Sequence, residues 1–489
     1  MKLVQRRLER GFDAVAFYAA ASADGTRADT ALFEANDGRV LIMVGAAVRA
    51  SARGESVEME ALSVNGRALL SGLSDAPGRP NFPHICREYP APASNDPQIR
   101  LRAPAPLHAL RALLEAAGTA TDPFAAILLG ISGFDQAGFG EALPELPPHP
   151  LGVPDFLYWV PEALVVVEPG GAARLLCPVF GDDPALTHDA ARRLEALLPL
   201  TGATALPEPP PASLGEPEVD LDDDAFRAVV LRAKEHIAAG DVYQIVPSRT
   251  FTAPCPQPFD AYRRLRTVEP TSYRFFVAAP GWTLFGASPE TSVRLTPDGD
   301  GGAIVEVKPI AGTRPRGATI DEDDRLEAEM RLDAKELAEH MMLVDLARND
   351  VARVSAPGTR RVSKLLTVER FARVMHLVSS VTGRLAPGLD AFDALAACLN
   401  VGTLTGAPKI RAMQLLRTLE ATRRGPYGGA VGWVNAAGAM DTAVVIRSAV
   451  VADGLARVRA GAGVVHDSNP QAEADETRRK AAALLGVLT

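Results

Sequence analysis

The amino-acid sequence predicts a mixed fold of β-strands and α-helices. Apolar, β-branched runs such as RVLIMVGAAVRA (39–50) and EALVVVEPG (162–170) are typical of strands. Between them, APLHALRALLEAAG (105–118) and LTHDAARRLEALLPL (186–200) carry apolar residues at helical spacing. Proline-rich turns separate these elements, so the N-terminal part is expected to consist of many short helices and strands.

The chain is too long for one ordinary hydrophobic core. With 489 residues, we expect two or more domains or one large composite domain. The segment LPEPPPASLGEPEVD (206–220) has five prolines and no periodicity, which is typical of a linker or crossing loop. We therefore predict an N-terminal part over residues 1–220 and a C-terminal part over residues 221–489.

The C-terminal part begins with LDDDAFRAVVLRAKEHIAAGD (221–241), a helix with aspartates at its start and Gly240 at its end. The further elements predicted from periodicity are strands at 242–251, 303–310 and 370–385, one long helix at 325–354, a glycine turn and helix at 400–421, and a strand, turn and helix at 454–488.

Composition and charge exclude several classes of protein. The net charge of −9 argues against a surface that binds duplex nucleic acid. No apolar run approaches 18 residues, so we expect no membrane span. The four cysteines are far apart and lack metal-binding spacing, which favours four buried thiols in a reducing cytoplasm over disulfides or zinc.

The stretch VKPIAGTRPRG (307–317) combines two prolines, two glycines and two arginines. Such a segment cannot run as a helix or as the interior of an ordinary strand. We predict a rigid turn here.

Two predicted helices carry carboxylates at helical spacing. Glu336 and Glu339 are three residues apart, and Glu473, Glu476 and Lys480 also share one face. Each set taken alone is most often a solvated surface. If the two sets converged, they would form an all-oxygen site of the kind that Mg²⁺ prefers.

Glycine turns and isolated polar residues provide the remaining candidates. Gly461 and Gly463 lie just before the last helix, where glycine lets backbone N–H groups approach a ligand. GTLTGAPK fails the spacing of a phosphate loop, so we reject nucleotide binding. Tyr427 and Arg447 are near strand ends, and an arginine in an apolar strand usually has a carboxylate partner in the protein or in a ligand.

Glu290 and His376 are candidates for acid–base chemistry. Glu290 follows Ser-Pro between two strand-like segments, and His376 is in the middle of a predicted strand. A single histidine in a strand is more often structural, so that alternative stays open for His376. No nucleophile motif of the G-x-S-x-G type occurs.

The motifs together resemble one family. They occur in the order DVYQIVPSR, GASPE, PIAGTRPRG, KELAEHMMLVDLARND, MHLVSSVTG, GTLTGAPKIRAM, YGGAVG, IRSA and GAGVVHDSNPQAEADETRRKA. This set is similar to that of chorismate-utilising enzymes, and most of all to anthranilate synthase component I. The resemblance is dense over residues 225–489 and weaker before them. It implies an α+β fold of two antiparallel sheets packed face to face with helices outside, so the two parts would share one composite β-sandwich.

The resemblance also implies roles for the candidate residues. It implies Mg²⁺ held by Glu339 and Glu476, supported by Glu336 and Glu473. One chorismate carboxylate would meet this metal, and Lys480 would lie nearby. The implied contacts of the other carboxylate are Arg447, Tyr427 and the backbone of Gly461, Ala462 and Gly463. Thr313 would contact the substrate, Glu290 would be the general acid for the C4 hydroxyl, and His376 would serve the loss of pyruvate.

Two positions distinguish members of this family. Aminodeoxychorismate synthases often carry a nucleophilic lysine where this chain has Ala311, and isochorismate and salicylate synthases have a water-activating lysine where it has Gln244. Ammonia needs little activation, so both positions favour anthranilate synthase. None of the cysteines fits a glutaminase motif, so the ammonia is expected from a separate glutamine amidotransferase subunit in a hetero-oligomer.

A tryptophan-feedback site is the last feature that the resemblance implies, at LFEA (32–35) and EPTSYRF (269–275). The residues concerned are Glu34, Ala35, Pro270 and Tyr273. Ala35 replaces a serine of the family pattern, Ser272 a proline and Arg274 a methionine, so we expect weak or no inhibition by tryptophan. Three alternatives stay open: an enzyme that stops at 2-amino-2-deoxyisochorismate, an aminodeoxychorismate synthase, and a catalytically inactive amino-acid sensor.

Overall fold

The computed structural model describes residues 1–488 except 10, 74–82, 95, 204, 213–215, 372–373 and 421. Part of the predicted linker at 206–220 is therefore outside the described residues. The helices are α1 Ala14–Ser22, α2 Val64–Ser71, α3 Pro97–Arg102, α4 Leu107–Ala117, α5 Pro184–Leu197, α6 Asp223–Ala238, α7 Pro258–Val268, α8 Ile320–Leu332, α9 Ala334–Val354, α10 Ala391–Cys398, α11 Lys409–Leu419 and α12 Pro470–Leu485. Short 3₁₀ helices are η1 Phe134–Phe139, η2 Leu198–Gly202 and η3 Gly402–Leu404.

The strands before residue 260 are β1 Lys2–Arg7, β2 Thr30–Glu34, β3 Val40–Arg53, β4 Ser56–Ala61, β5 His84–Glu88, β6 Ile127–Ser132, β7 Phe156–Val167, β8 Ala173–Val179, β9 Glu218–Val219, β10 Gln244–Ile245 and β11 Ser248–Pro254. The later strands are β12 Tyr273–Ala279, β13 Trp282–Ser288, β14 Thr291–Pro297, β15 Ala303–Val307, β16 Ile310–Pro315, β17 Arg361–Arg370, β18 Val374–Arg384, β19 Gly406–Ala407, β20 Ala430–Asn435, β21 Met440–Val444, β22 Ser448–Ala452 and β23 Leu455–Gly461.

Antiparallel pairing links 21 of these strands into one network, and β10 pairs with β19 beside it. Strands of the N-terminal part pair directly with strands of the C-terminal part: β2 with β12, β6 with β20, and β9 with β11. The predicted α+β class is confirmed, and strands of both parts belong to one connected antiparallel network. The division between residues 220 and 221 stays a prediction, since both sides contribute to the same network.

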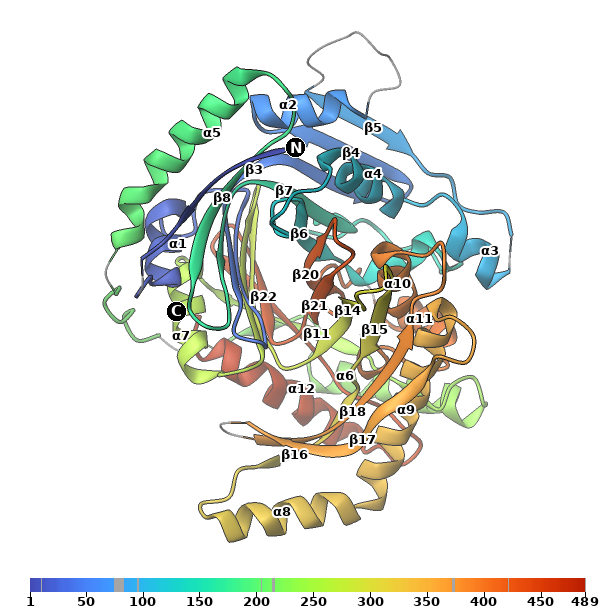
Figure 1. Ribbon diagram of the computed structural model, residues 1–489. Coiled ribbons are helices and arrows are strands. Elements are labelled where there is room, and N and C mark those ends of the chain that lie inside the picture. Colours follow the sequence, from blue (N-terminus) through green and yellow to red (C-terminus); the bar gives the residue numbers. More distant parts are fainter. Residues whose placement is uncertain are drawn as a thin grey trace.

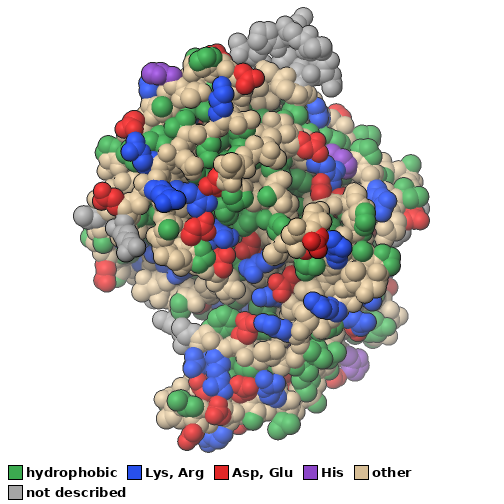
Figure 2. Space-filling model, in the orientation of Figure 1, with side chains coloured by type: hydrophobic (Ala, Val, Ile, Leu, Met, Phe, Trp, Pro, Cys, Tyr) green, Lys and Arg blue, Asp and Glu red, His purple; other side chains and the backbone are tan. Residues whose placement is uncertain are grey.

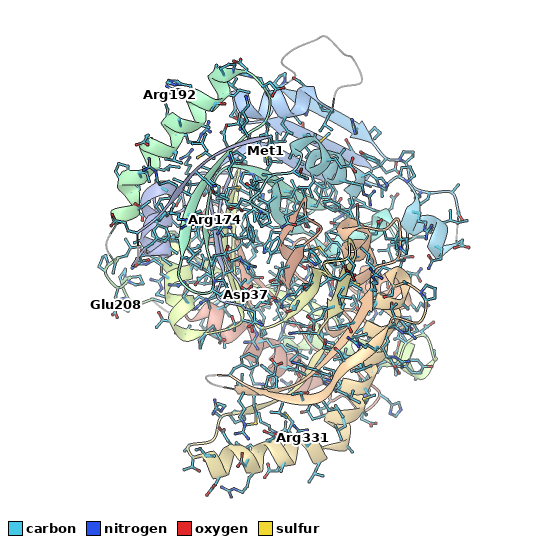
Figure 3. The ribbon with its side chains drawn as sticks, in the orientation of Figure 1. Met1, Asp37, Arg174, Arg192, Glu208 and Arg331 are labelled. Carbon is cyan, nitrogen blue, oxygen red and sulfur yellow. The ribbon has the colours of Figure 1, made fainter. Side chains whose placement is uncertain are left out.

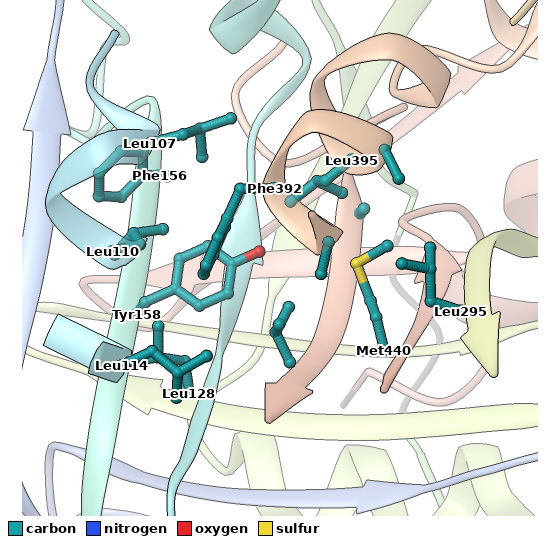
Figure 4. Packing of buried hydrophobic residues seen from close by; sticks show 14 of the residues in the cluster. Leu107, Leu110, Leu114, Leu128, Phe156, Tyr158, Leu295, Phe392, Leu395 and Met440 are labelled. Atoms are coloured by element: carbon teal, nitrogen blue, oxygen red, sulfur yellow. The ribbon is translucent and has the colours of Figure 1, made fainter. Parts of the chain in front are cut away.

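Two packed regions hold this network in place. One hydrophobic cluster combines residues of β3, β7, β12, β13 and β20, so strands from both parts face each other across it. A second combines Leu110 and Leu114 of α4, Phe392 and Leu395 of α10 and the buried Tyr158 of β7 (Figure 4). Burying each large apolar side chain stabilises the fold by roughly 1.5–3 kcal/mol, so these clusters fix the strands that carry the site.

The long helix predicted at 325–354 is wrong in one respect, because the chain forms two helices there. α8 ends at Leu332, and Asp333 caps α9 by accepting hydrogen bonds from the backbone N–H groups of Lys335 and Glu336. An aspartate in this role satisfies amide donors that have no partner inside the helix. In Figure 1, α8 consequently projects from the body beside β16 and β17.

The stretch 307–317 also differs from the predicted turn. It contains β16, which pairs with β18 and has a bulge between Ala311 and Thr313. Gly312 at the bulge has φ +82°, a conformation that residues with a Cβ rarely adopt. The glycine therefore allows a proline-containing segment to continue as a strand.

Surface features agree with the sequence in most respects. Acidic and basic side chains are interspersed over the face shown in Figure 2. None of the helices in the described ranges is long and apolar enough to cross a membrane. All four cysteines are free, but Cys86 is exposed on β5, so the prediction of four buried thiols is wrong for that residue.

Candidate active site

Glu290 lies between β13 and β14 and is the most perturbed carboxyl group near the predicted site. Its side chain is buried, and the hydroxyl of Thr403 in η3 donates a hydrogen bond to its carboxyl oxygen at 3.0 Å. Burial raises the pKa of Glu290 to about 8, although the Thr403 hydrogen bond and the charge of Lys480 oppose the increase. Glu290 is therefore largely protonated at neutral pH, as a general acid must be.

His376 and Thr313 are brought together by the register of β16 on β18. The two residues are direct cross-strand partners, and the Thr313 hydroxyl lies 2.9 Å from Nδ1 of His376. Burial lowers the pKa of His376, and the nearby charge of Arg447 lowers it further. The imidazole is thus neutral at pH 7, so it can accept a proton.

Lys480 of α12 connects the last glycine turn to the buried acid. Its ammonium group donates a hydrogen bond to the carbonyl oxygen of Gly461 at 3.0 Å and pairs with Glu476 at 2.7 Å. Its charge also reaches Glu290 and the buried Tyr427. A Cβ atom on Gly461 would lie 3.1 Å from the Tyr427 hydroxyl, so glycine is needed for this close packing.

Gln244 faces the same glycine turn from β10. Its side chain is buried, and its amide nitrogen would lie 2.8 Å from a Cβ added to Gly463. The amide oxygen of Gln244 has no hydrogen-bond partner among the described residues. A buried acceptor without a partner costs free energy, so a ligand donor at this point would be stabilised.

The four predicted metal-binding carboxylates come from α9 and α12. Burial raises the pKa of Glu339, and the charges of Glu336 and Glu476 raise it further. Burial and Glu476 also raise the pKa of Glu473, against a hydrogen bond from Ser468. The two helices therefore bring their carboxylates close enough to disfavour each other's charged form.

These carboxylates do not form a preformed metal site in the part of the chain that the structure describes, since no three acidic, histidine or cysteine side chains converge there. Two of them bind cations of the protein instead. Arg314 donates to Glu336 at 3.0 Å, and Lys480 pairs with Glu476 at 2.7 Å. The donors are hard oxygens with excess negative charge, which fits Mg²⁺.

Two of the predicted substrate-binding groups have contacts within the protein. The backbone N–H of Ala462 donates to the carbonyl oxygen of Pro247 at 3.1 Å, because pairing along β11 and β23 continues past Gly461. Arg447 does not lie within a strand: it occupies a bend with φ +48° between β21 and β22 and is partly exposed. Its carboxylate partner in the protein is Glu269, at 4.0 Å.

The feedback-site-like residues surround a cavity of only about 20 Å³, which Glu34, Ala35, Tyr273 and Arg274 line. Pro270 is not part of this lining. Arg274 pairs with Glu34 at 3.0 Å. The space accommodates about one water molecule and no amino acid.

Sequence reasoning missed several side chains that hold this site. Thr403 belongs to the GTLTGAPK motif, but the sequence does not show that it lies next to Glu290. Arg314 is in the quoted PIAGTRPRG stretch, yet its contact with Glu336 depends on the α9 position. His340 is buried on α9, and its Nε2 forms a hydrogen bond with the hydroxyl of Ser379 on β18 at 2.7 Å, which holds the two elements together. Nothing in its sequence position indicated this contact.

The chain matches the chorismate binding enzyme family over residues 87–486 and belongs to this family.

Individual relatives are more specific. The chain is 47% identical to the pyocyanine-specific anthranilate synthase component 1 of Pseudomonas aeruginosa, over 91% of this chain and 86% of that protein. It is 45% identical to anthranilate synthase component 1 of Vibrio cholerae, over 92% and 88%. Among solved structures, anthranilate synthase component I from Streptococcus pneumoniae superposes with a TM-score of 0.71 and 31% identity, covering 91% of this chain and 92% of that one.

Proposed function

We propose that this chain is the chorismate-converting component of an anthranilate synthase, which aminates chorismate with ammonia and eliminates pyruvate to give anthranilate. The observation that carries the proposal is the buried Glu290, whose pKa of about 8 keeps a proton available beside Lys480 and the Gly461 turn. The relatives named as anthranilate synthase component 1 support the same reaction over about nine-tenths of the chain.

Amination requires departure of the C4 hydroxyl of chorismate. Glu290 donates its proton to that oxygen, which leaves as water while ammonia forms a bond to C2 and the ring double bonds shift. Thr403 positions the carboxyl group by donating to its oxygen at 3.0 Å. A positioned acid of matched pKa contributes typically 10²- to 10⁴-fold, on the order of 3–5 kcal/mol of barrier.

Gln244 is suited to ammonia rather than water as the nucleophile. Its amide oxygen, buried and unpaired among the residues that the structure describes, can accept a hydrogen bond from an N–H group. An amide cannot remove a proton from water, whereas ammonia attacks without such help. Gln244 thus holds the nucleophile beside the Gly463 turn and does not act as a base.

In pyruvate elimination, the hydrogen on C2, the carbon that bears the new amine, leaves as a proton while the C3–O bond to the enolpyruvyl group breaks. The ring becomes aromatic, and the released enolpyruvate takes up a proton to give pyruvate. The neutral imidazole of His376 can accept the C2 proton, and Thr313 orients the imidazole through Nδ1 at 2.9 Å. A purely structural role for His376 is less favoured, because its imidazole contacts Thr313 and lies near the charge of Arg447. Both are predicted site residues. Arg447 and Tyr427 are suited to bind a substrate carboxylate.

Mg²⁺ is the proposed cofactor, held by Glu339 and Glu476 with Glu336 and Glu473 in support. When bound, the ion supplies charge that orients and neutralises a carboxylate of the substrate. The carboxylates of α9 and α12 raise each other's pKa, so a divalent cation would relieve their repulsion. Lys480 would then be free to move from Glu476 toward the substrate.

The ammonia source and the pathway complete the proposal. A separate glutamine amidotransferase subunit supplies ammonia in the cytoplasm, as the word "component" in the relatives' names supports.

A second candidate function is an enzyme of a specialised pathway that stops at 2-amino-2-deoxyisochorismate. It is favoured by the closed cavity at Glu34 and Arg274, which would suit an enzyme outside tryptophan control.

One experiment separates these candidates. Purified chain is incubated with chorismate, Mg²⁺ and an ammonium salt at high pH, and the product is identified by mass and fluorescence. Anthranilate supports the proposal, whereas an aminated product that keeps the enolpyruvyl group supports the second candidate. A parallel reaction with glutamine should give no product, and glutamine-dependent turnover by the pure chain would contradict the need for a partner.

A further inference from the structure

A second cavity of about 210 Å³ lies next to the candidate active site but contains a different set of side chains. Tyr427 lines it, and none of Glu290, His376, Lys480 or Gly461 does. Its most basic members are four arginines, listed as Arg423, Arg424, Arg457 and Arg459. Threonine and serine hydroxyls and the ring of His149 complete the polar lining.

Strand register explains how these groups meet. On β23, Arg457 and Arg459 are two residues apart, so their side chains lie on the same face. Their cross-strand partners on β11 are Thr252 and Thr250, whose side chains therefore lie on that face as well. The arrangement places two guanidinium groups and two hydroxyls together on a rigid sheet.

The positive charge of this cavity exceeds what the protein neutralises. Arg424 and Arg459 share one buried carboxylate, Glu420, at 2.7 and 2.9 Å. Arg423 pairs with Asp155 at 3.0 Å. Nη1 of Arg457 is buried and has no hydrogen-bond partner among the described residues.

The only acidic residue in the described lining is Asp220, and its carboxylate accepts a hydrogen bond from the backbone N–H of Thr250 at 2.7 Å. It is exposed at the rim. Arg423 donates to Asp155, and Arg424 and Arg459 donate to Glu420. Arg457 is the arginine of this lining that keeps a buried donor without a partner among the described residues. Guanidinium donors without a carboxylate are typical of sites that bind oxyanions.

His149 lies in the same lining. Burial, together with the charges of Arg459, Arg457 and Arg423, lowers its pKa to about 4. The ring is therefore neutral, so it adds a polar contact without adding to the charge. The cavity and the unpaired guanidinium donor that lines it together point to an anionic occupant.

We infer that this cavity is a second binding site for a small oxyanion, a carboxylate or a phosphate, held mainly by Arg457 with the hydroxyls of Thr250 and Thr252. The volume is far larger than the 30 Å³ share of one water molecule and accommodates a compound of a few heavy atoms. The site goes beyond the proposed reaction, because Glu290, His376 and Lys480 do not line this cavity.

Calorimetric titration with inorganic phosphate and, separately, with pyruvate tests the inference, in a buffer of low chloride that contains neither anion class. We expect saturable binding of at least one probe, weakened about tenfold or more by Arg457→Gln. The probe that binds more tightly identifies whether the cavity prefers a phosphate or a carboxylate. Among the described residues Arg457 forms no ion pair with a carboxylate, and its Nη1 has no hydrogen-bond partner. Its substitution therefore leaves none of their carboxylates unpaired, and circular dichroism should show an intact fold.

Two control variants make the test specific. Arg447→Gln removes a cation of the candidate active site, and Arg192→Gln removes an exposed one on α5 (Figure 3). Both should retain the binding that Arg457→Gln loses. Absence of saturable binding by either probe, or loss of binding in Arg447→Gln with full binding in Arg457→Gln, would overturn the inference.

A second readout does not depend on affinity. A bound anion stabilises the imidazolium form, so the pKa of His149 measured by NMR should rise from about 4 when the probe is added. The resonance is assigned with His149→Asn among the eight histidines. An unchanged pKa at a saturating probe concentration would place the anion elsewhere.

Discussion

Glu290 and Glu34, two of the buried glutamates among the described residues, have similar burial and opposite pKa shifts. Burial raises the pKa of Glu290 to about 8, because its closest hydrogen-bond partner is the neutral Thr403 and the nearest cation is Lys480. Burial also acts on Glu34, but hydrogen bonds and charges from Arg266, Arg274 and Tyr262 outweigh it and lower that pKa. A buried carboxyl group becomes an acid or an anchor according to its partners.

The consequence for function follows directly. Glu290 stays protonated at neutral pH and can donate its proton to a substrate. Glu34 is ionised, and its ion pairs with Arg266 and Arg274 hold side chains against the small cavity. Glu34 is bonded by Arg266 at 2.6 Å and by Tyr262 at 2.6 Å, besides Arg274. The first region resembles a catalytic site, and the second resembles the interior of a structural ion pair.

The largest effect is expected from Glu290→Gln, because the amide cannot donate the proton that the departing hydroxyl needs. Ammonia-dependent kcat should fall on the order of 10²- to 10⁴-fold with the fold intact. Wild-type kcat, corrected for the concentration of free ammonia, should fall as pH rises through about 8. Glu115→Gln, an exposed residue of α4, is the control; near-normal turnover in Glu290→Gln would remove this residue from catalysis.

Glu339→Gln should abolish turnover at limiting Mg²⁺ while the protein stays folded. One carboxylate fewer weakens a site that Mg²⁺ binds through few protein ligands, so we expect at least about a tenfold higher Mg²⁺ requirement. The measurement is ammonia-dependent activity against Mg²⁺ concentration. Wild-type activity at limiting Mg²⁺ would exclude α9 from the metal site.

His376→Met should change the product rather than only the rate. Without an imidazole to take the ring proton, the aminated intermediate that retains the enolpyruvyl group should accumulate and be detected by mass. Thr313→Val, which keeps the imidazole but removes its hydroxyl partner, should give a smaller change. An inert His376→Met variant, or one that makes anthranilate normally, would assign this histidine another role.

Glu34→Ala should destabilise the protein, because it leaves Arg266 and Arg274 without their carboxylate. Removal of one partner from a buried pair costs about 3–5 kcal/mol in the free energy of unfolding. The pH dependence separates the two glutamates. Glu34 stabilises the fold above its ordinary pKa of 4.5 and loses this contribution as pH falls through its lowered folded value. Glu290, held protonated, makes the fold less stable as pH rises from 4.5 toward about 8.

Denaturant unfolding at several pH values measures both contributions. Equal stability of wild type and Glu34→Ala at neutral pH would mean that Arg266 and Arg274 find other partners. Glu34 would then not be the structural counterpart of Glu290.

The smallest effect concerns tryptophan. Arg274 and Glu34 occupy the region where the family resemblance implies a feedback site, and the cavity of about 20 Å³ has no room for an amino acid. L-tryptophan should therefore inhibit ammonia-dependent activity weakly or not at all, with calorimetry as the direct check. Micromolar inhibition would show that the pocket opens, and Arg274→Met would then be expected to strengthen it.

Much of the fold was predictable because its signals are local. The strand at 39–50 and the helix at 105–118 follow from periodicity, and they appear as β3 and α4. The break at Asp333 was not predicted, since the apolar pattern continues through it and only the cap hydrogen bonds reveal the boundary. The bulge at Gly312 likewise depends on the partner strand β18.

For the candidate site, the sequence by itself determined which chemical groups are available: Glu336 and Glu339 on one helical face, Glu290 after Ser-Pro, and glycines before α12. Only the tertiary structure decided their state. It placed Thr403 against Glu290 and two arginines against Glu34, and it left Arg457 facing a cavity. The physical reason is that helical spacing is fixed by bonds within a few residues. A pKa or an unpaired charge depends instead on groups that are hundreds of residues away in sequence and a few ångströms away in space.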